Sequence, residues 1–343
     1  MSTLRLLTII TLAASLLSCA TQPAEPSAAP SSGEKQTEET AVEAPRCDDI
    51  VRLEPSQPIA QVSWMMTGAD TTHIDYRIPA GTNGEWTSWR PVELTFREGD
   101  AYNARVVLDT PADTIELRGG DELHNAQFSL QSHPTARRPA LDEHSAQRPE
   151  IARACSENDI YLVAAGDDDQ THRPPNDLVV PREKWGAIAP DRVCRKIADP
   201  YRITFHHTFV PDAGDDPARA TRQIQSFHLN ERGWCDIGYH FLIGADGRIF
   251  EGSAVPHRLA AHVGDENEGN VGIAFIGDYT DQKPTDAQTR AAVELVDWLH
   301  HTYDIELSRQ AIRGHGEWPG QSTACPGDGL RPLIDEIVHF AER

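Results

Sequence analysis

The sequence predicts an α/β domain with a central mixed β-sheet flanked by helices, preceded by an all-β, sandwich-like accessory domain. The first expectation comes from residues 179–343, where stretches with helical periodicity alternate with short apolar runs. The second comes from residues 47–135, where short runs rich in Val, Thr, Trp, Phe and Leu are separated by Gly, Pro, Asn and Asp. A chain of 343 residues accommodates two domains, because one domain takes roughly 100–200 residues.

The overall charge argues against one broad class of function. The chain carries 31 Lys and Arg residues against 53 Asp and Glu residues, a formal net charge of −22. Phosphate backbones are bound by basic surfaces, so we expect no nucleic-acid partner.

Residues 1–19 are typical of a lipoprotein signal peptide. Arg5 supplies a positive start, and residues 6–17 form a mostly apolar run that is short for a membrane span. The sequence Leu-Leu-Ser before Cys19 resembles the bacterial lipobox, whose cysteine becomes the lipidated first residue of the mature protein. We therefore expect a lipid anchor at a membrane of the bacterial cell envelope, on the periplasmic side of the outer membrane or at the cell surface. An ordinary signal peptide, cleaved nearby, is the alternative.

Residues 20–46 predict a disordered tether. Ala, Pro, Ser, Glu, Thr and Gln dominate this segment, which has no aromatic residue. Such a composition buries too little apolar surface to offset the entropy lost on ordering.

Residues 47–135 contain six runs with full or partial period-2 alternation, the pattern of an antiparallel sandwich. Trp86 and Trp89 have two interpretations: a carbohydrate-stacking pair, or aromatic residues that fill the core or line the edge of the sandwich, which we favour. The runs are 61–65, 73–78, 92–96, 104–108, 114–118 and 126–130.

Residues 136–178 predict a linker, which contains one possible strand at 160–165. The acidic residues 167–169 could suggest a calcium loop, but their spacing does not match an EF-hand, so a solvated turn is the preferred interpretation.

Residues 179–343 combine helices and strands. Thr285 and Gln288 have the spacing of a capping box at the start of a helix, and further helices are expected at 217–230 and 330–342. Strands are expected at 202–206, 239–243, 249–251 and 271–276.

Three separated pieces of this region indicate a mononuclear zinc site: residues 203–208, residues 233–240, and residues 314–315 followed by 323–327. The run Ile-Thr-Phe-His-His, residues 203–207, would place an imidazole at the end of a strand, and His315 and Cys325 would add two ligands from one loop. Neutral imidazole and thiolate suit tetrahedral zinc, and three protein ligands leave one position open to water.

Residues 233–252, together with Lys-Trp-Gly-Ala at 184–187, resemble the peptidoglycan recognition protein family. That family belongs to the zinc-dependent N-acetylmuramoyl-L-alanine amidases related to the bacteriophage lysozyme-amidases (amidase type 2). The similarity runs from about residue 180 to about residue 330. It implies that Zn²⁺ is held by His206, His315 and Cys325, with His206 preferred over His207 because the family uses the first histidine of the pair.

The resemblance also implies roles for other residues. Tyr239 matches the family's catalytic tyrosine, and the Thr323 hydroxyl would stabilise the oxyanion. The residues assigned to substrate binding are His207, His240 and His262, the last because it lies where relatives line the peptide groove. One departure is that residues 316–322 hold about two residues more than the usual stretch between this histidine and cysteine.

The remaining cysteines are expected to form disulfides. Four cysteines allow three connectivities, and we favour two pairs. Metal ligation is the alternative for Cys235. The favoured pairs are Cys194 with Cys235, which flank the motifs that lead into the site, and Cys47 with Cys155, which would tie together the ends of the accessory domain.

The implied function is hydrolysis of the amide between N-acetylmuramic acid and L-alanine of peptidoglycan stem peptides, so a muropeptide is the expected substrate. Two alternatives remain at this point. One is a non-catalytic peptidoglycan-binding lipoprotein, acting as sensor or anchor, and the other is a zinc amidase or peptidase that acts on a different bond.

Overall fold

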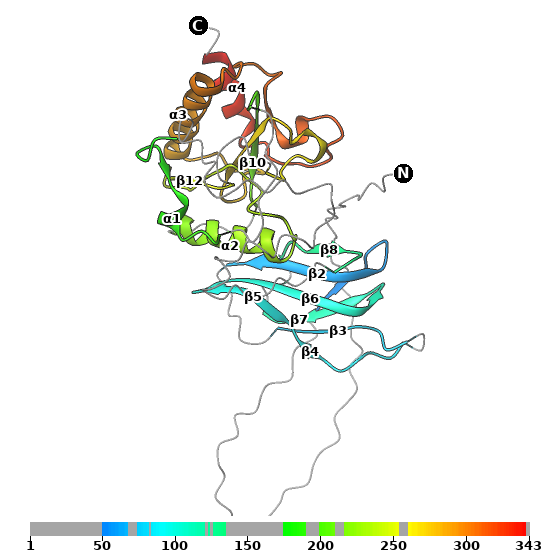
Figure 1. The fold of residues 1–343 in the computed structure, drawn as a ribbon. Helices are drawn as coiled ribbons and strands as arrows, with labels where there is room; N and C mark the ends of the chain where they lie inside the picture. The colour runs from blue at the N-terminus through cyan, green and yellow to red at the C-terminus, as the bar shows by residue number, and fades with distance from the viewer. Residues whose placement is uncertain are drawn as a thin grey trace, which may run out of the picture. The chain divides into compact units, whose positions relative to one another are not determined.

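The computed structural model describes residues 50–67, 74–81, 84–120, 123, 126–134, 174–189, 199–209, 216–253 and 260–340. Contacts divide the chain into two compact units. Residues 63–69, 93–105 and 134–343 form the second unit, and the rest of the chain up to residue 133 forms the first. Figure 1 shows the labelled helices and strands.

Eight strands lie in the described part of residues 50–134, and they form two four-stranded sheets. The strand order is β1-β7-β3-β4 in one sheet, which is antiparallel throughout, and β5-β6-β2-β8 in the other. The strands are β1 (Ile50–Leu53), β2 (Ile59–Met66), β3 (Asp75–Arg77), β4 (Arg90–Pro91), β5 (Glu93–Glu98), β6 (Ala101–Ala112), β7 (Ile115–Arg118) and β8 (Ser129–Gln131).

Six of these strands coincide with predicted runs. The sequence pattern does not predict β1 and β4, which have four and two residues. The two sheets agree with a β-rich region. A separate accessory domain over residues 47–135 stays a prediction, because residues 63–69 and 93–105 group with the second unit.

Trp86 and Trp89 are half-buried and stack with arginines. The Arg77 guanidinium lies 5.0 Å from the ring centroid of Trp86 and 4.5 Å from that of Trp89. Arg52 lies over Trp86 and Arg118 over Trp89, at 5.3 and 4.5 Å. These cation–π contacts use ring faces that a sugar would need for stacking, which supports the structural interpretation of the two tryptophans.

The second unit contains a six-stranded mixed sheet with the order β14-β10-β13-β11-β12-β9. Every pair in it is parallel except β11 with β12. The prediction of a central mixed sheet is therefore confirmed, although the sequence pattern does not reveal β9 and β14. The strands are β9 (Val179–Val180), β10 (Arg202–His207), β11 (Phe241–Ile243), β12 (Ile249–Glu251), β13 (Asn270–Phe275) and β14 (Ile312–Gly314).

Helices cover the two faces of this sheet (Figure 1). Ile203 and Phe205 of β10 belong to the core formed with α3 (Asp286–Tyr303) and α4 (Arg331–Phe340). Leu242 and Phe250 belong to the core formed with α1 (Arg182–Trp185) and α2 (Pro217–Asn230). Because side chains alternate along a strand, Thr204 and His206 lie on the face of β10 opposite to Ile203 and Phe205.

The three predicted helices are present. Helix α2 has the predicted bounds, and α4 begins at Arg331, one residue after the predicted start. Helix α3 begins with the predicted capping box, in which the Thr285 hydroxyl accepts from the Gln288 backbone N–H and the Gln288 side chain accepts from the Thr285 N–H.

The two sequence motifs on which the family resemblance rests are joined by buried polar contacts. Arg182, beside the Lys-Trp-Gly-Ala motif, forms an ion pair with the buried Asp236 at 3.0 Å. The Trp185 indole N–H donates to the Glu251 carbonyl oxygen at 2.9 Å. Gln225 of α2 donates to Asp236 as well, at 2.9 Å. These contacts explain why residues far apart in the sequence form one pattern.

Several predictions fall outside the described residues. They concern the signal peptide with Cys19, the tether, most of the linker with its acidic turn, and Cys47, Cys155 and Cys194. Cys235 is disulfide-bonded, but its pairing with Cys194 stays a prediction. Within the ranges that the structure describes, no helix has both the length and the apolar character needed to cross a membrane.

Residues 93–105 of the second unit contact α2 through buried polar groups. The Gln223 side-chain amide donates to the carbonyl oxygens of Met66 and Tyr102, at 2.8 and 2.9 Å. The Asn103 side chain donates to the Gln223 carbonyl oxygen at 3.0 Å. The buried Gln223 side chain of α2 is thus hydrogen-bonded to strand backbone.

Glu231, which follows the last residue of α2, is a fully buried carboxyl group. Its side chain accepts a hydrogen bond from the Thr95 hydroxyl. Burial raises the pKa of Glu231 to about 8, although the Thr95 bond and the Arg105 guanidinium oppose this shift and Glu93 adds to it. The carboxyl group is therefore largely protonated near neutral pH.

We expect Glu231→Gln to weaken the dependence of stability on pH. The folded-state pKa lies above the ordinary value of 4.5, so the wild-type folded state binds the extra proton between pH 4.5 and about 8, and its free energy of unfolding falls as pH rises through that interval. Urea unfolding at several pH values measures this. Glu294→Gln, at an exposed position of α3, is the matched control. Parallel pH profiles for the wild type and Glu231→Gln would contradict the prediction.

We expect Thr285→Ala to destabilise the second unit by about 1 kcal/mol, because the first turn of α3 loses its side-chain acceptor. The Thr285 hydroxyl also donates to the Ala245 carbonyl oxygen at 2.8 Å, and this bond is lost too. Chemical denaturation checks the size of the effect. Thr285→Ser keeps the hydroxyl and should be close to wild type, so an equal loss in both variants would show that the cap is not the cause.

Candidate metal centre

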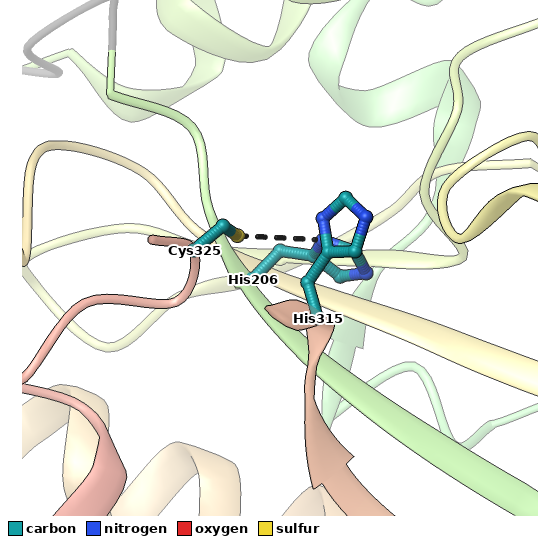
Figure 2. Close-up of side chains that lie close together, drawn as sticks. All are labelled: His206, His315 and Cys325. Atoms are coloured by element: carbon teal, nitrogen blue, oxygen red, sulfur yellow. Dashed lines mark hydrogen bonds between the residues drawn. The ribbon is translucent and has the colours of Figure 1, made fainter. Parts of the chain in front are cut away.

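His206, His315 and Cys325 come together on one side of the sheet (Figure 2). One potential ligand atom from each residue lies within 4.8 Å of the others. The Cys325 Sγ atom is 3.6 Å from His206 Nδ1, and the two imidazole ring centroids are 4.7 Å apart. His206 and Cys325 are buried, and His315 is half-buried. The structure therefore brings together the three residues that the sequence predicts as metal ligands.

The register of the sheet places the two histidines side by side. Strand β10 is parallel to β14, and Phe205 is the register partner of Gly314. The residue that follows each of these partners is a histidine. His206 follows Phe205 within β10, and His315 follows Gly314, the last residue of β14. Parallel neighbours in a sheet end at the same edge, so the pairing fixes the separation of the two imidazoles.

Glycines let the cysteine loop approach His315 closely. A Cβ atom on Gly316 would lie 2.3 Å from the Thr323 carbonyl oxygen, and one on Gly314 would lie 2.5 Å from the Pro326 ring. The Gly316 N–H donates to the Cys325 carbonyl oxygen at 2.8 Å. The residues on both sides of His315 must therefore lack a side chain for Cys325 to reach the site.

Burial sets the protonation states of the three side chains. It lowers the pKa of His206 well below the ordinary value, with the neighbouring histidines adding to the effect, and it lowers the pKa of His315. It raises the pKa of the Cys325 thiol to about 12. Both imidazoles are thus neutral near pH 7 and keep a lone pair, whereas a thiolate at Cys325 needs a bound cation to balance its charge.

These residues fit a zinc ion. Tetrahedral zinc with Zn–S of about 2.3 Å and Zn–N of about 2.0–2.1 Å separates sulfur from nitrogen by about 3.6 Å. The Cys325 Sγ to His206 Nδ1 distance is also 3.6 Å. A set of two imidazoles and one thiolate is typical of zinc, and three protein ligands leave a fourth position open.

Tyr239 and Thr323 lie beside this group. The Tyr239 ring centroid is 5.2 Å from that of His206. Burial, and a smaller electrostatic effect of Cys325, raise the pKa of Tyr239, so its phenol stays protonated and can donate a hydrogen bond. The Thr323 hydroxyl accepts from the Cys325 backbone N–H at 3.1 Å, which keeps it close to the cysteine and leaves its own proton to donate.

The three histidines assigned to substrate binding are all buried. His207 points to the opposite face of β10 from His206, where its Nδ1 accepts from the Tyr279 N–H at 3.0 Å. His240 Nδ1 accepts from the Gly272 N–H at 2.9 Å. His262 Nδ1 lies 3.0 Å from His206 Nε2. Each imidazole therefore contacts protein groups, and contact with substrate stays a prediction.

The lengthened stretch between His315 and Cys325 is anchored at two positions. Trp318 is buried, and its indole N–H donates to the Thr204 hydroxyl at 2.7 Å. The Gln321 Oε1 atom lies 3.1 Å from His315 Nε2. This stretch, which the family resemblance predicts to be about two residues longer than usual, thus does not separate Cys325 from the histidines.

Sequence reasoning missed Gln321 and Asn270 as residues of the site. Gln321 contacts His315 directly, and the Asn270 carbonyl oxygen contacts His262 Nε2 at 2.9 Å. Only the extra loop length hinted at a role for Gln321. No local pattern identifies Asn270, because its contact with His262 is made by the backbone carbonyl.

Comparisons with known proteins identify the family to which this part of the chain is similar. The N-acetylmuramoyl-L-alanine amidase family model matches residues 197–328. Peptidoglycan recognition protein 1 of Bos indicus is 35% identical over 173 residues, covering 47% of this chain and 85% of that protein. The N-acetylmuramoyl-L-alanine amidase of Sus scrofa is 36% identical over 166 residues, covering 47% of this chain but 27% of that protein.

Among solved structures, the crystal structure of the Drosophila peptidoglycan recognition protein SD covers 46% of this chain and 93% of its own, with 31% identity and a TM-score of 0.43. The matched family model includes His206, His315 and Cys325 in its range of residues 197–328. Because it is 35% identical to Peptidoglycan recognition protein 1 over 85% of that protein's length, the chain belongs to the peptidoglycan recognition protein and amidase type 2 family.

Proposed function

We propose that this chain is a zinc-dependent N-acetylmuramoyl-L-alanine amidase. The reaction is hydrolysis of the amide between the lactyl group of N-acetylmuramic acid and L-alanine of the stem peptide. Water supplies the oxygen of the new lactyl carboxylate, the carbon–nitrogen bond breaks, and the alanine nitrogen leaves as a free amine. The observation that carries the proposal is the group His206, His315 and Cys325, whose ligand atoms lie within 4.8 Å of one another.

Binding of peptidoglycan alone would not need this group. A buried thiol next to two neutral imidazoles has a donor set suited to zinc, and the 3.6 Å distance from Cys325 Sγ to His206 Nδ1 matches tetrahedral ligation. Zinc held there would polarise the amide carbonyl and lower the pKa of water towards about 7.

The chain's own side chains would stabilise the charge that develops on the amide oxygen. Tyr239 keeps its phenolic proton, because burial raises its pKa, and donates it as a hydrogen bond. The Thr323 hydroxyl, oriented by the Cys325 N–H, is a second donor. His206 and His315 act as neutral ligands, since burial lowers the pKa of both.

We further propose that the enzyme is tethered to a membrane of the bacterial cell envelope by lipid on Cys19, with residues 20–46 as the tether. This rests on the sequence Leu-Leu-Ser before the cysteine and on the Pro- and Ser-rich composition that follows. Membrane fractionation of the full chain and of Cys19→Ser tests it, and an unchanged distribution between the two would contradict it.

We expect Cys325→Ala to abolish both zinc binding and product release. The wild type, purified and incubated with peptidoglycan, should contain about one zinc per chain and release stem peptides with an amino-terminal L-alanine, detected by mass spectrometry. Ser322→Ala, at an exposed position of the same loop, is the matched control and should behave as wild type. A wild type that binds the wall without zinc and without release would instead indicate a recognition protein.

We expect Tyr239→Phe to keep zinc and lower kcat by about 100- to 1,000-fold, the usual cost of removing one oxyanion donor. Phenylalanine preserves the ring that lies 5.2 Å from His206, so the fold and the metal content should be unchanged. Steady-state kinetics on a soluble muropeptide, with zinc quantified in parallel, measures this. Wild-type turnover in the variant would remove Tyr239 from the reaction.

A further inference from the structure

The turn formed by residues 262–270 contacts both candidate histidine ligands, each through one intermediate side chain. His262 connects the turn to His206, and Gln321 connects it to His315. Both connections run to the ring nitrogen Nε2, and His206 Nδ1 lies 3.6 Å from Cys325 Sγ. Because both connections contact Nε2 of a candidate ligand, they can have the same effect on the two histidines.

The first connection ends on a backbone carbonyl. His262 Nε2 lies 2.9 Å from the Asn270 carbonyl oxygen, which can only accept, so the proton of neutral His262 is on Nε2. Its Nδ1 is then an acceptor, and it lies 3.0 Å from His206 Nε2. His206 must donate there, so its proton is also on Nε2. Its Nδ1 carries the lone pair, 3.6 Å from Cys325 Sγ.

The second connection ends on another backbone carbonyl. The Gln321 side-chain nitrogen donates to the Val263 carbonyl oxygen at 3.1 Å, which fixes the orientation of the amide. The amide oxygen then faces His315 Nε2 at 3.1 Å and accepts its proton. His315 Nδ1 therefore carries the lone pair, as His206 Nδ1 does.

The turn itself is held in place by side chains. The Asn267 side-chain oxygen accepts from the N–H groups of His262 and Val263, at 3.1 and 2.8 Å. Glycines make room for both intermediates. A Cβ atom on Gly272 would lie 2.8 Å from the His262 ring, and one on Gly264 would lie 3.2 Å from the Gln321 amide.

We propose that His262 and Gln321 are positioning residues that hold His206 and His315 in the Nε2–H tautomer, so that both histidines present Nδ1 to the metal. The proposal rests on the proposed zinc site and deepens it. Gln321 belongs to the lengthened stretch between His315 and Cys325, so the extra loop supplies one of the two positioning groups. Hydrogen bonds to the remote nitrogen of a ligating histidine commonly contribute about 10- to 100-fold in metal affinity.

The test on Gln321 measures the zinc dissociation constant by competition with a chromophoric chelator. Gln321→Ala should bind zinc about 10- to 100-fold more weakly than wild type. Ser322→Ala is the loop control and should bind zinc as the wild type does. Wild-type affinity in Gln321→Ala would overturn the role of Gln321.

A second measurement needs no variant. Long-range nitrogen–proton NMR of the metal-free wild type should show His206, His262 and His315 as Nε2–H tautomers, and Nδ1–H at any of them would overturn the assignment. A wild type that binds no zinc but shows these tautomers would overturn the proposed function and support the hydrogen-bond assignment. The failure of one proposal is thus distinguishable from the failure of the other.

Discussion

The parallel pairing of β10 with β14 is the constraint on which the site depends. Opposing Phe205 to Gly314 puts His206 and His315 at the same edge of the sheet, and a shift of one residue would turn His206 into the core that His207 now faces. Hydrophobic packing on both sides of the sheet enforces this register. Ile203 and Phe205 are fully buried against α3 and α4, so the strand cannot slip without exposing them.

Burial also determines which charges the side chains of the site can carry. The same burial that fixes the ligands keeps the two imidazoles neutral and raises the pKa of Cys325 to about 12. A thiolate in such surroundings needs a cation, and a neutral imidazole pair needs defined tautomers to point lone pairs at it. Backbone carbonyls of Val263 and Asn270 meet the second need, because a carbonyl oxygen can only accept.

The lengthened loop before Cys325 is compatible with this arrangement because it is anchored. The buried Trp318 bonds Thr204, whose own hydroxyl donates to the Asn270 side chain at 2.8 Å. Gln321 joins the loop to the turn at residues 262–270. Bonds from Trp318 and Gln321 thus hold the loop next to the histidines. This favours the hydrolytic interpretation over a disabled, binding-only site.

The family resemblance, and not a local pattern, selected His206, His315 and Cys325, which the structure brings together. The sequence by itself determined the central mixed sheet, the bounds of α2 and the capping box of α3, because periodicity and capping are local properties. It could not reveal β14, a three-residue strand visible only through its pairing with β10. Nor could it separate the roles of adjacent histidines. Only the tertiary structure decided that His262 lies behind His206 and that Gln321 contacts His315, since both contacts depend on backbone acceptors brought together from distant segments.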